Sequence, residues 1–459
     1  MKRVGKEAGG TALPNGLGKE KTLETIGILG LGYVGLPLAV EFAEAGKRVI
    51  GVDVNAHRMA DLRRGESYIE DIPSDRLQAV LDRIEPTTRT AGLARCDAIV
   101  ICVPTPLTPN REPDLTPLMT AASELSRVLQ PGQLIVLEST TYPGTTRERL
   151  APVLEESGLR VGDDFNLAFS PERVDPGRED HTLRTTPKVI GGLTDACRER
   201  AMELYGSVCD ELVPVSCPET AEMTKLLENI FRSVNIALVN ELSILADRMN
   251  IDIREVVDAA STKPFGFMRF DPGPGMGGHC LPVDPFYLSW RAREFELTTE
   301  FIELAGKVNQ QMPVVCAERV ERMLNDASKP VRGSRIAILG VAYKPGVSDI
   351  RESPALKIIE HLQARGGDVV YHDPHVAELP QQGLSSLPLD EAIAGADVAV
   401  IVTAHASVDH KAVAAAVPVV DLRGVTRTAI GKTKSKTKAR AAKQAAANRT
   451  SPAATPQRV

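Results

Sequence analysis

Aromatic residues make up only 4% of the sequence, tryptophan occurs once, and the seven cysteines form no CxxC pair. An odd number of unpaired cysteines is typical of reduced thiols in a cytoplasm and argues against a disulfide framework or a zinc ribbon. No apolar run approaches the ~20 residues of a membrane-spanning helix, and the basic N-terminus lacks the apolar segment of a secretory signal. We therefore expect a cytoplasmic protein without a membrane partner.

The remaining composition is that of an ordinary globular protein. The 459 residues are 43% hydrophobic and 25% charged, which predicts two to four domains. Residues 431–459 contain eight Lys or Arg and no Asp or Glu, so the rest of the chain is more acidic than the net charge of −6 suggests. An acidic core argues against a nucleic-acid-binding function for that part of the chain. We predict a disordered leader at 1–24 and a basic disordered tail at 431–459, which either contacts an anionic partner or is simply solvated.

Two α/β segments flank a helical one. Residues 25–212 open with a strand, a glycine-rich turn, a helix and a second strand, the pattern of a Rossmann βαβ unit. Residues 213–328 include a glycine-free stretch, apolar on most faces, that predicts a long helix buried between layers or subunits. Residues 329–430 repeat the α/β pattern without the GxGxxG spacing. The predicted fold class is α/β, with an N-terminal Rossmann domain and a C-terminal Rossmann-like domain joined by a long-helix central domain.

The strongest local motif is GLGYVG, which follows the first strand and opens a helix. Gly30 allows the tight turn, Gly32 lets a pyrophosphate approach the backbone, and Gly35 permits close packing of helix on strand. Asp53 stands at the end of the second strand, where a carboxylate can bond ribose hydroxyls and would repel a 2′-phosphate. The motif therefore predicts NAD rather than NADP.

A second motif, MGGHCLPVD, surrounds Cys280. Glycines before this cysteine give a bulky ligand room and leave the thiol accessible. A thiolate is a strong nucleophile toward a carbonyl carbon, and Asp284 lies four residues on as a base or a water-positioning group. The alternatives are a small apolar cysteine in a turn and a His279–Cys280 metal site, although no second ligand pair has suitable spacing. We therefore predict no metal site.

Polar residues on the long helix form a third signal. Lys225 and Asn229 are four residues apart and share one face, which Glu222 and Arg232 extend. An ammonium and an amide projecting together from a buried helix can hold an oxyanion. A stripe of buried or intersubunit salt bridges is the alternative.

Two further polar segments follow predicted strands. Ser139–Thr141 and Ser170–Arg173 stand where open α/β sheets bind ligands. For Thr140, capping of the next helix is the structural alternative.

These motifs together resemble the UDP-glucose/GDP-mannose dehydrogenase family. The resemblance covers roughly residues 25–424, keeps the family's order, and is most similar to the bacterial UDP-N-acetylglucosamine 6-dehydrogenases of polysaccharide pathways. The segments that carry it are GLGYVGLPLA, VPTP, STTYPGTT, SPERVDPG, AEMTKLLENIFRSVNIALVNE, GMGGHCLPVDPFYL and GVAYKPGVSDIRESPA.

The resemblance implies a four-electron oxidation of the 6-hydroxymethyl group of a UDP-sugar to a carboxylate, with two NAD reduced in succession. Cys280 would hold the aldehyde as a thiohemiacetal and then a thioester, which water releases. Lys225 and Asn229 would stabilise the oxyanions, Asp284 with a Thr140-bound water would handle protons, and Glu172 would assist thioester hydrolysis.

The resemblance also implies the binding residues and the assembly. The C-terminal domain would bind UDP, and the long helix would form the core of a homodimer or a higher homo-oligomer. The cofactor residues would be Gly30, Gly32, Tyr33, Val34, Gly35, Asp53, Arg58, Thr105 and Thr140. The substrate residues would be Glu172, Arg173, Lys225, Asn229, Phe270, Gly277, Lys344, Arg351 and Arg423.

Two departures from the UDP-glucose branch bear on the sugar. Pro176 stands where that branch has a second glutamate, and Val283 replaces a lysine. Both argue against UDP-glucose and fit a pocket opened for a bulkier N-acetyl group. The resemblance favours UDP-N-acetylglucosamine as the substrate, with UDP-N-acetylmannosamine and UDP-glucose as alternatives. A single-step hydroxyacid dehydrogenase would not need Cys280 or a third domain. A non-catalytic NAD or nucleotide-sugar sensor is the remote alternative, against which the joint presence of Lys225, Asn229, Cys280 and Asp284 argues.

Overall fold

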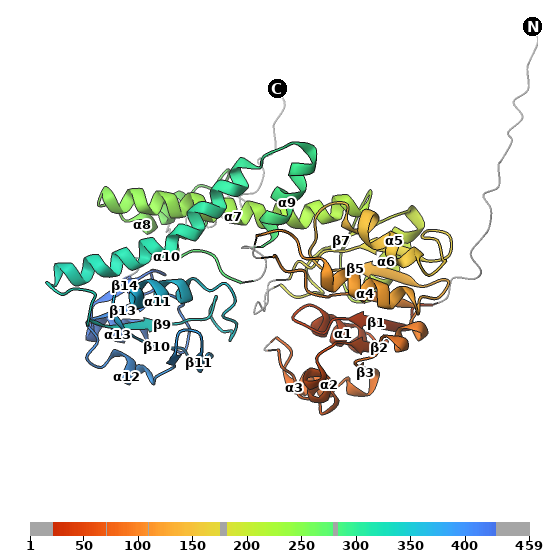
Figure 1. Ribbon diagram of the computed structural model, residues 1–459, viewed down its shortest axis with the longest axis horizontal. Coiled ribbons are helices and arrows are strands. Elements are labelled where there is room, and N and C mark those ends of the chain that lie inside the picture. Colours follow the sequence, from red (N-terminus) through yellow and green to blue (C-terminus); the bar gives the residue numbers. More distant parts are fainter. Residues whose placement is uncertain (1–21, 70, 109, 175–180, 279–282, 428–459) are drawn as a thin grey trace, which may run out of the picture.

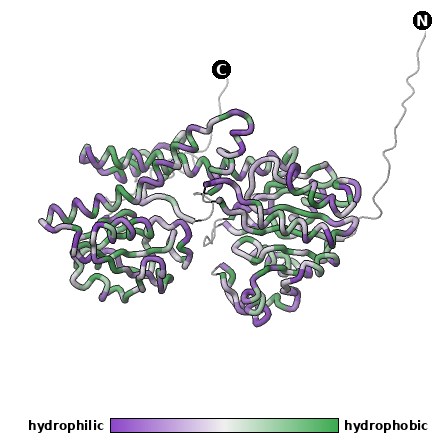
Figure 2. Tube along the Cα trace, in the orientation of Figure 1, coloured by the Kyte–Doolittle hydropathy of each residue, from purple (hydrophilic) through white to green (hydrophobic). Residues whose placement is uncertain are grey.

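The computed structural model describes residues 22–69, 71–108, 110–174, 181–278 and 283–427. Figure 1 shows two α/β domains, with the long helix α7 (Pro218–Arg248) lying across both. In Figure 2 the hydrophobic parts of the trace gather in the sheet strands, whereas hydrophilic and hydrophobic residues alternate along the long helices. Within these described ranges, no helix is long and apolar enough to cross a membrane.

The N-terminal domain is built on an eight-stranded sheet in the order β3-β2-β1-β4-β5-β6-β7-β8. All neighbouring strands are parallel except β6 and β7, which are antiparallel. The strands are β1 (Thr25–Leu29), β2 (Arg48–Val52), β3 (Ile84–Thr87), β4 (Ala98–Ile101), β5 (Leu134–Leu137), β6 (Asn166–Phe169), β7 (Lys188–Gly192) and β8 (Leu212–Val215). β4, β5, β6 and β7 are buried at every position, and β1 and β2 at all but their first residue, as expected for strands covered by helices on both faces.

Helices cover both faces of this sheet. They are α1 (Gly35–Glu44), α2 (Ala56–Arg63), α3 (Ser74–Gln78), α4 (Thr116–Ser126), α5 (Ala151–Glu155) and α6 (Asp195–Tyr205), with a π-helical turn, η3, at Thr145–Leu150. Two hydrophobic cores result, one on each face of the sheet. The carboxyl ends of β1, β2, β4, β5 and β6 meet at one edge of the sheet, where ligands bind in open α/β folds.

The described residues of the central segment include four α-helices. They are α7 (Pro218–Arg248), α8 (Ile253–Ala260), α9 (Asp284–Ala292) and α10 (Glu300–Asp326). The predicted long helix is confirmed: α7 has 31 residues and packs along α10. It is less buried than its apolar faces suggested, because several of its large apolar side chains are exposed in the single chain.

The C-terminal domain contains a four-stranded parallel sheet in the order β10-β9-β13-β14. Its strands are β9 (Arg335–Leu339), β10 (Asp368–His372), β13 (Val398–Ile401) and β14 (Val419–Asp421), and a small hairpin pairs β11 (Glu378–Leu379) with β12 (Leu384–Ser385). Its helices are α11 (Pro354–Ala364), α12 (Leu389–Ile393) and α13 (His410–Ala416).

The two sheets repeat one hydrogen-bonding device after the first strand. Gly30 N–H donates to Val52 O at 2.8 Å, and Gly340 N–H donates to His372 O at 2.9 Å. The carboxylate of Asp53 accepts from Leu31 N–H at 2.9 Å, as that of Asp373 accepts from Val341 N–H at 2.7 Å. The α/β fold class with two Rossmann-like units and a helical centre is therefore confirmed.

Candidate active site

The glycine turn between β1 and α1 leaves space on its outer side. Gly30 has φ +97°, and a Cβ there would lie 2.7 Å from the carbonyl oxygen of Cys102. A Cβ at Gly35 would overlap Gly30 O, whereas a Cβ at Gly32 would meet no atom within 4 Å. The turn thus has no room for a side chain at Gly30 or Gly35 but has free space at Gly32. Val34, the N-cap of α1, lies beside the turn. This arrangement fits a pyrophosphate held at a helix N-terminus.

Asp53 is fixed at the end of β2. Its carboxylate accepts the N–H groups of Leu31 and Asn55, both at 2.9 Å, and lies 3.8 Å from the guanidinium of Arg58. Arg58 in turn covers the ring of Tyr68, whose hydroxyl donates to Leu31 O at 2.6 Å. The acid, the cation and the glycine turn form one unit, and these residues fit an adenosine ribose with free hydroxyls.

Thr105 and Thr140 lie together beyond the ends of β4 and β5. The hydroxyl of Thr105 donates to Thr140 O at 2.7 Å, and Tyr287 of α9 donates its hydroxyl to Thr105 O. Tyr287 is buried, and its hydrogen bond connects the cofactor edge of the sheet to α9, the helix that begins with Asp284. Sequence reasoning missed Tyr287, whose only signal is its position three residues after Asp284.

Three predicted catalytic side chains and the main chain of Glu172 converge where α7, α9 and the segment after β6 meet. The ammonium of Lys225 donates to Glu172 O, and the amide of Asn229 donates to a carboxylate oxygen of Asp284 at 2.5 Å. Lys225, Asn229 and Asp284 are all buried. Burial raises the pKa of Asp284 to about 7, against the opposing effects of the Lys225 charge and the Asn229 hydrogen bond.

In the segment after β6, the side chains of Glu172 and Arg173 both bind neighbouring groups. A carboxylate oxygen of Glu172 accepts from Val174 N–H at 2.5 Å. Arg173 pairs with Glu228 of α7 at 2.6 Å and donates to Pro187 O at 2.6 Å. Arg173 is thus occupied in holding this segment to α7.

Glu222 lies on the buried face of α7 that also carries Lys225 and Asn229, whereas Arg232, the other residue of the predicted polar stripe, is exposed. The buried carboxylate of Glu222 accepts from Gly144 N–H at 2.7 Å, from Thr146 N–H at 2.9 Å and from the Thr146 hydroxyl at 2.7 Å. The residue therefore fixes the start of η3 to α7, because its position on the helix turns it toward that loop.

The loop that precedes Cys280 packs on the C-terminal domain. Gly278 N–H donates to Arg351 O at 3.0 Å, and a Cβ at Gly277 would lie 2.9 Å from Glu352 O. Cys280 itself, the predicted nucleophile, lies outside the described residues, as does Pro176. On the two sides of Cys280, Gly278 contacts the C-terminal domain and Asp284 contacts α7.

The predicted substrate residues of the C-terminal domain lie in the loops after β9 and β14. Lys344 lies over the ring of Tyr343 at 5.6 Å, and Arg351 binds the Asp349 carboxylate. Arg351 also covers the ring of Tyr33 at 5.4 Å, so the C-terminal domain reaches the glycine turn.

Of two other predicted substrate residues, Arg423 follows β14 in the C-terminal domain and Phe270 lies in the central segment. Arg423 donates to Val402 O at 2.6 Å, and burial lowers its pKa to about 10. Phe270 packs edge-on against Phe231 of α7 at 5.8 Å.

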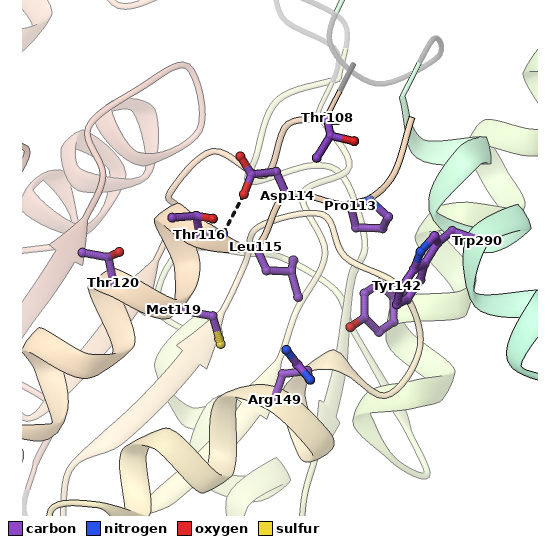
Figure 3. Close-up of a pocket in the computed structure, with 10 residues that line it drawn as sticks. All are labelled: Thr108, Pro113, Asp114, Leu115, Thr116, Met119, Thr120, Tyr142, Arg149 and Trp290. Carbon is purple, nitrogen blue, oxygen red and sulfur yellow. Dashed lines mark hydrogen bonds between the residues drawn. The ribbon is translucent and has the colours of Figure 1, made fainter. Parts of the chain in front are cut away.

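A cavity of about 490 Å³ is lined by residues of the segment before α4, of α4, of η3 and of α9, together with Tyr142 (Figure 3). The Tyr142 ring lies 5.0 Å from that of Trp290 in its wall, and Asp114 accepts from Thr116 N–H at 2.9 Å. Its lining residues are Thr108, Pro113, Asp114, Leu115, Thr116, Met119, Thr120, Tyr142, Arg149 and Trp290. None of them is a predicted catalytic residue, so we do not assign the substrate to this cavity. In the described part of the chain, no group of three His, Cys, Asp or Glu side chains could hold a metal ion.

The fold and the site define a nucleotide-dependent oxidoreductase with two Rossmann-like domains. Three family models match in order: the NAD binding domain of the UDP-glucose/GDP-mannose dehydrogenase family at 24–209, the central domain at 219–311 and the UDP binding domain at 337–428. The chain belongs to this family and is an NAD-dependent UDP-sugar dehydrogenase. The family resemblance and the NAD cofactor predicted from the sequence are confirmed.

Named relatives differ in the sugar. The UDP-N-acetyl-D-mannosamine dehydrogenase of Escherichia coli K12 is 39% identical over 399 residues, which cover 83% of this chain and 93% of that protein. The UDP-N-acetyl-D-glucosamine 6-dehydrogenase of Pseudomonas aeruginosa is 36% identical over 354 residues, 77% of this chain and 83% of that protein. The structure of a UDP-D-ManNAc dehydrogenase from Pyrococcus horikoshii superposes with a TM-score of 0.81 at 35% identity, covering 89% of this chain and 97% of that one.

Proposed function

We propose that the protein oxidises the 6-hydroxymethyl group of a UDP-N-acetylhexosamine to a carboxylate in two steps on one site. The overall reaction consumes the alcohol, two NAD+ and one water, and yields the carboxylate, two NADH and three protons. NAD+ supplies the hydride acceptor in both steps. A cytoplasmic location is part of this proposal.

The observation that carries the proposal is the convergence of Lys225, Asn229, Asp284 and Glu172. A buried ammonium and a buried amide beside one another can stabilise an alkoxide or a tetrahedral oxyanion, because both are donors in a site that excludes water. Asp284, with a pKa of about 7, is suited to accept a proton from the substrate hydroxyl or from water near neutral pH.

Cys280 has the role of covalent carrier in this proposal. Its thiolate adds to the aldehyde carbon, which gives a thiohemiacetal; loss of a hydride then gives a thioester. Water displaces the thiol and forms the carboxylate. A good nucleophile is required because the aldehyde must stay bound between the two oxidations. Before Cys280, Gly277 and Gly278 pack on the C-terminal domain, and after it Asp284 binds Asn229 of α7.

The acetamido sugar is supported by relatives of both epimers. Relatives named for UDP-N-acetylmannosamine and for UDP-N-acetylglucosamine share 39% and 36% identity with this chain. The sequence motifs favour UDP-N-acetylglucosamine, and the relatives named for UDP-N-acetylmannosamine make that sugar the second candidate.

The test is the yield of NADH per limiting sugar. Purified protein with excess NAD+ receives UDP-GlcNAc, UDP-ManNAc or UDP-glucose in turn. About two NADH per sugar with one of the acetamido sugars supports the proposal and identifies the epimer. One NADH with a released aldehyde contradicts the role of Cys280, and turnover of UDP-glucose alone contradicts the substrate class.

Substitution of the nucleophile gives the first prediction. Cys280→Ser should reduce steady-state NADH formation at least ~10³-fold, because a hydroxyl is far less nucleophilic than a thiolate near neutral pH. Binding of the UDP-sugar, measured by calorimetry, should change little. Cys217→Ser, at the start of α7, is the matched control and should keep full turnover. Near-normal NADH production by Cys280→Ser would contradict the mechanism.

We further propose that α7 is the core of a homodimer. Large apolar side chains along it are exposed in the single chain, and an apolar stripe of this length on a soluble enzyme is typical of an association surface. The exposed residues on α7 are Met223, Leu227, Phe231, Leu238, Leu242 and Leu245.

A further inference from the structure

A second buried charged group lies directly beneath the segment that carries Glu172. Lys188 and Glu138 form an ion pair whose side chains are 3% and 0% exposed. Tyr205, the last residue of α6, donates its hydroxyl to the other oxygen of Glu138 at 2.6 Å. None of these residues has a role in the mechanism above.

Strand order explains why the pair forms there. β6 lies between β5 and β7, and β7 runs antiparallel to it with Phe169 opposite Gly191. Continued by three residues, this register puts Lys188 beyond the end of β6, beside Glu172. Glu138 directly follows β5 at the same edge. The Lys188 side chain therefore reaches across the point where the chain leaves β6.

The ammonium of Lys188 makes two hydrogen bonds and one cation–π contact. It donates to Glu138, donates to Pro171 O at 3.2 Å, and lies 5.0 Å from the centre of the Tyr205 ring. Burial opposes the charge on Lys188, but the carboxylates of Glu138 and Glu172 outweigh it and raise the pKa of Lys188. The ammonium thus stays charged and binds the Pro171 carbonyl. The carbonyl of the next residue, Glu172, accepts from Lys225.

Stability alone is a poor reason for such a pair. Desolvating two charges costs about as much as their attraction returns, and apolar replacement of a buried pair is often neutral. What the pair does supply is a fixed donor for the Pro171 carbonyl.

We propose that Lys188, held by Glu138, is a positioning residue for the dehydrogenase reaction. It fixes the backbone at Pro171 and so sets the position from which the carboxylate of the next residue, Glu172, acts. The inference rests on the proposed function, because Glu172 and Lys225 have roles only there. Its effect falls on thioester hydrolysis, the step that Glu172 assists.

The experiment compares Lys188→Met with the wild type in rapid-mixing and steady-state NADH assays. A misplacement of about 1 Å can cost on the order of 10²-fold in rate, so kcat should fall about 10–100-fold while KM for the sugar stays within about twofold. The burst of NADH in the first turnover should persist, because hydride transfer precedes hydrolysis. Lys188→Arg should recover part of kcat.

A second variant covers the case that Lys188→Met leaves Glu138 buried and unpaired and does not fold. Glu138→Gln/Lys188→Met removes both charges and should show the same low kcat and the same retained burst. Arg76→Met, which breaks the ion pairs of Arg76 with Glu41 and Glu44 on α1, is the matched control and should turn over normally.

Three results would overturn the inference: unchanged kcat in the double variant, no recovery with Lys188→Arg, or a burst lost together with kcat. A wild-type enzyme that does not form two NADH per sugar would instead overturn the proposed function, so the wild-type stoichiometry is measured first.

Discussion

The carboxyl group of Asp284 is buried and has one strong hydrogen-bond partner, the amide of Asn229. Asp284 is the first residue of α9, and its carboxylate accepts from the Asn229 amide at 2.5 Å in a site where Lys225 is the nearby charge. Burial disfavours the ionised form, whereas the amide and the ammonium favour it, and burial has the larger effect. A carboxyl group tuned in this way changes protonation state close to neutral pH, where a general base is most effective.

The activity of the enzyme should therefore depend on pH through Asp284. Because the base acts only when ionised, kcat/KM should rise as the pH increases through about 7. Asp284→Asn should lower kcat about 10²–10⁴-fold and remove this ascending limb, as measured by initial rates between pH 5 and pH 9. A limb near pH 7 that survives in Asp284→Asn would contradict the assignment.

The same shift affects stability in the opposite direction. The pKa of Asp284 rises from 3.8 to about 7 on folding, so between these values the folded state binds more protons than the unfolded state. The contribution of Asp284 to the free energy of unfolding is therefore fully favourable below the lower value and is lost as the pH rises toward 7. Asp284→Asn should flatten this part of the stability profile.

The junction between α7 and η3 depends on one side chain. Glu222 is fully buried and receives three hydrogen bonds from Gly144 and Thr146. Gly144 has φ +100°, so the loop turns sharply here, just after Thr140 and Tyr142. The long helix thereby sets the position of the segment that carries Thr140.

Removal of this carboxylate should be costly. Glu222→Ala leaves two buried N–H groups without acceptors, each worth about 1–3 kcal/mol, so we expect the free energy of unfolding to fall by about 2–5 kcal/mol in urea denaturation. Glu219→Ala on the same helix is the matched control, because its partially exposed pair with Arg147 of the same turn contributes about 1 kcal/mol or less. Equal losses in the two variants would contradict the structural role of Glu222.

Local patterns predicted the elements whose signals are contiguous in sequence. The β1–α1–β2 unit follows from the glycine spacing, and α7 follows from a long stretch without glycine. α9 was not predicted, because it begins at Asp284 within a Gly/Pro-rich segment whose prolines suggest a loop. The antiparallel placement of β7 was not predicted either, since strand direction depends on the path of the connection from β6.

The site, too, contains contacts that local sequence patterns predict and contacts that they do not. The shared face of Lys225 and Asn229 follows from helical periodicity. The contacts of Lys188 with Glu138 and of Tyr287 with Thr105 join residues 50 and 182 positions apart, and no local pattern encodes them. A charged residue at the start of an apolar strand was the one available signal for Lys188.

In the whole molecule, α7 lies across both α/β domains (Figure 1), and large apolar side chains along it are exposed. Leu238 and Leu242 are 56% and 44% exposed and are one helical turn apart, so they share a face. Association at this surface would pack α7 of one chain against α7 of the other and stiffen the helix from which Lys225 and Asn229 project.

Leu238→Glu/Leu242→Glu should convert the proposed dimer into monomers. Each side chain is already exposed in the single chain, so its replacement costs the folded monomer about 0.5 kcal/mol or less. In a dimer, the same change would bury four carboxylates without partners, which is far more costly. Light scattering after size-exclusion chromatography should give twice the chain mass for the wild type and the chain mass for the variant, with similar circular dichroism. Glu241→Gln, exposed on the same helix, should remain dimeric. A wild-type monomer, or a variant of unchanged mass, would show that α7 is not the association surface.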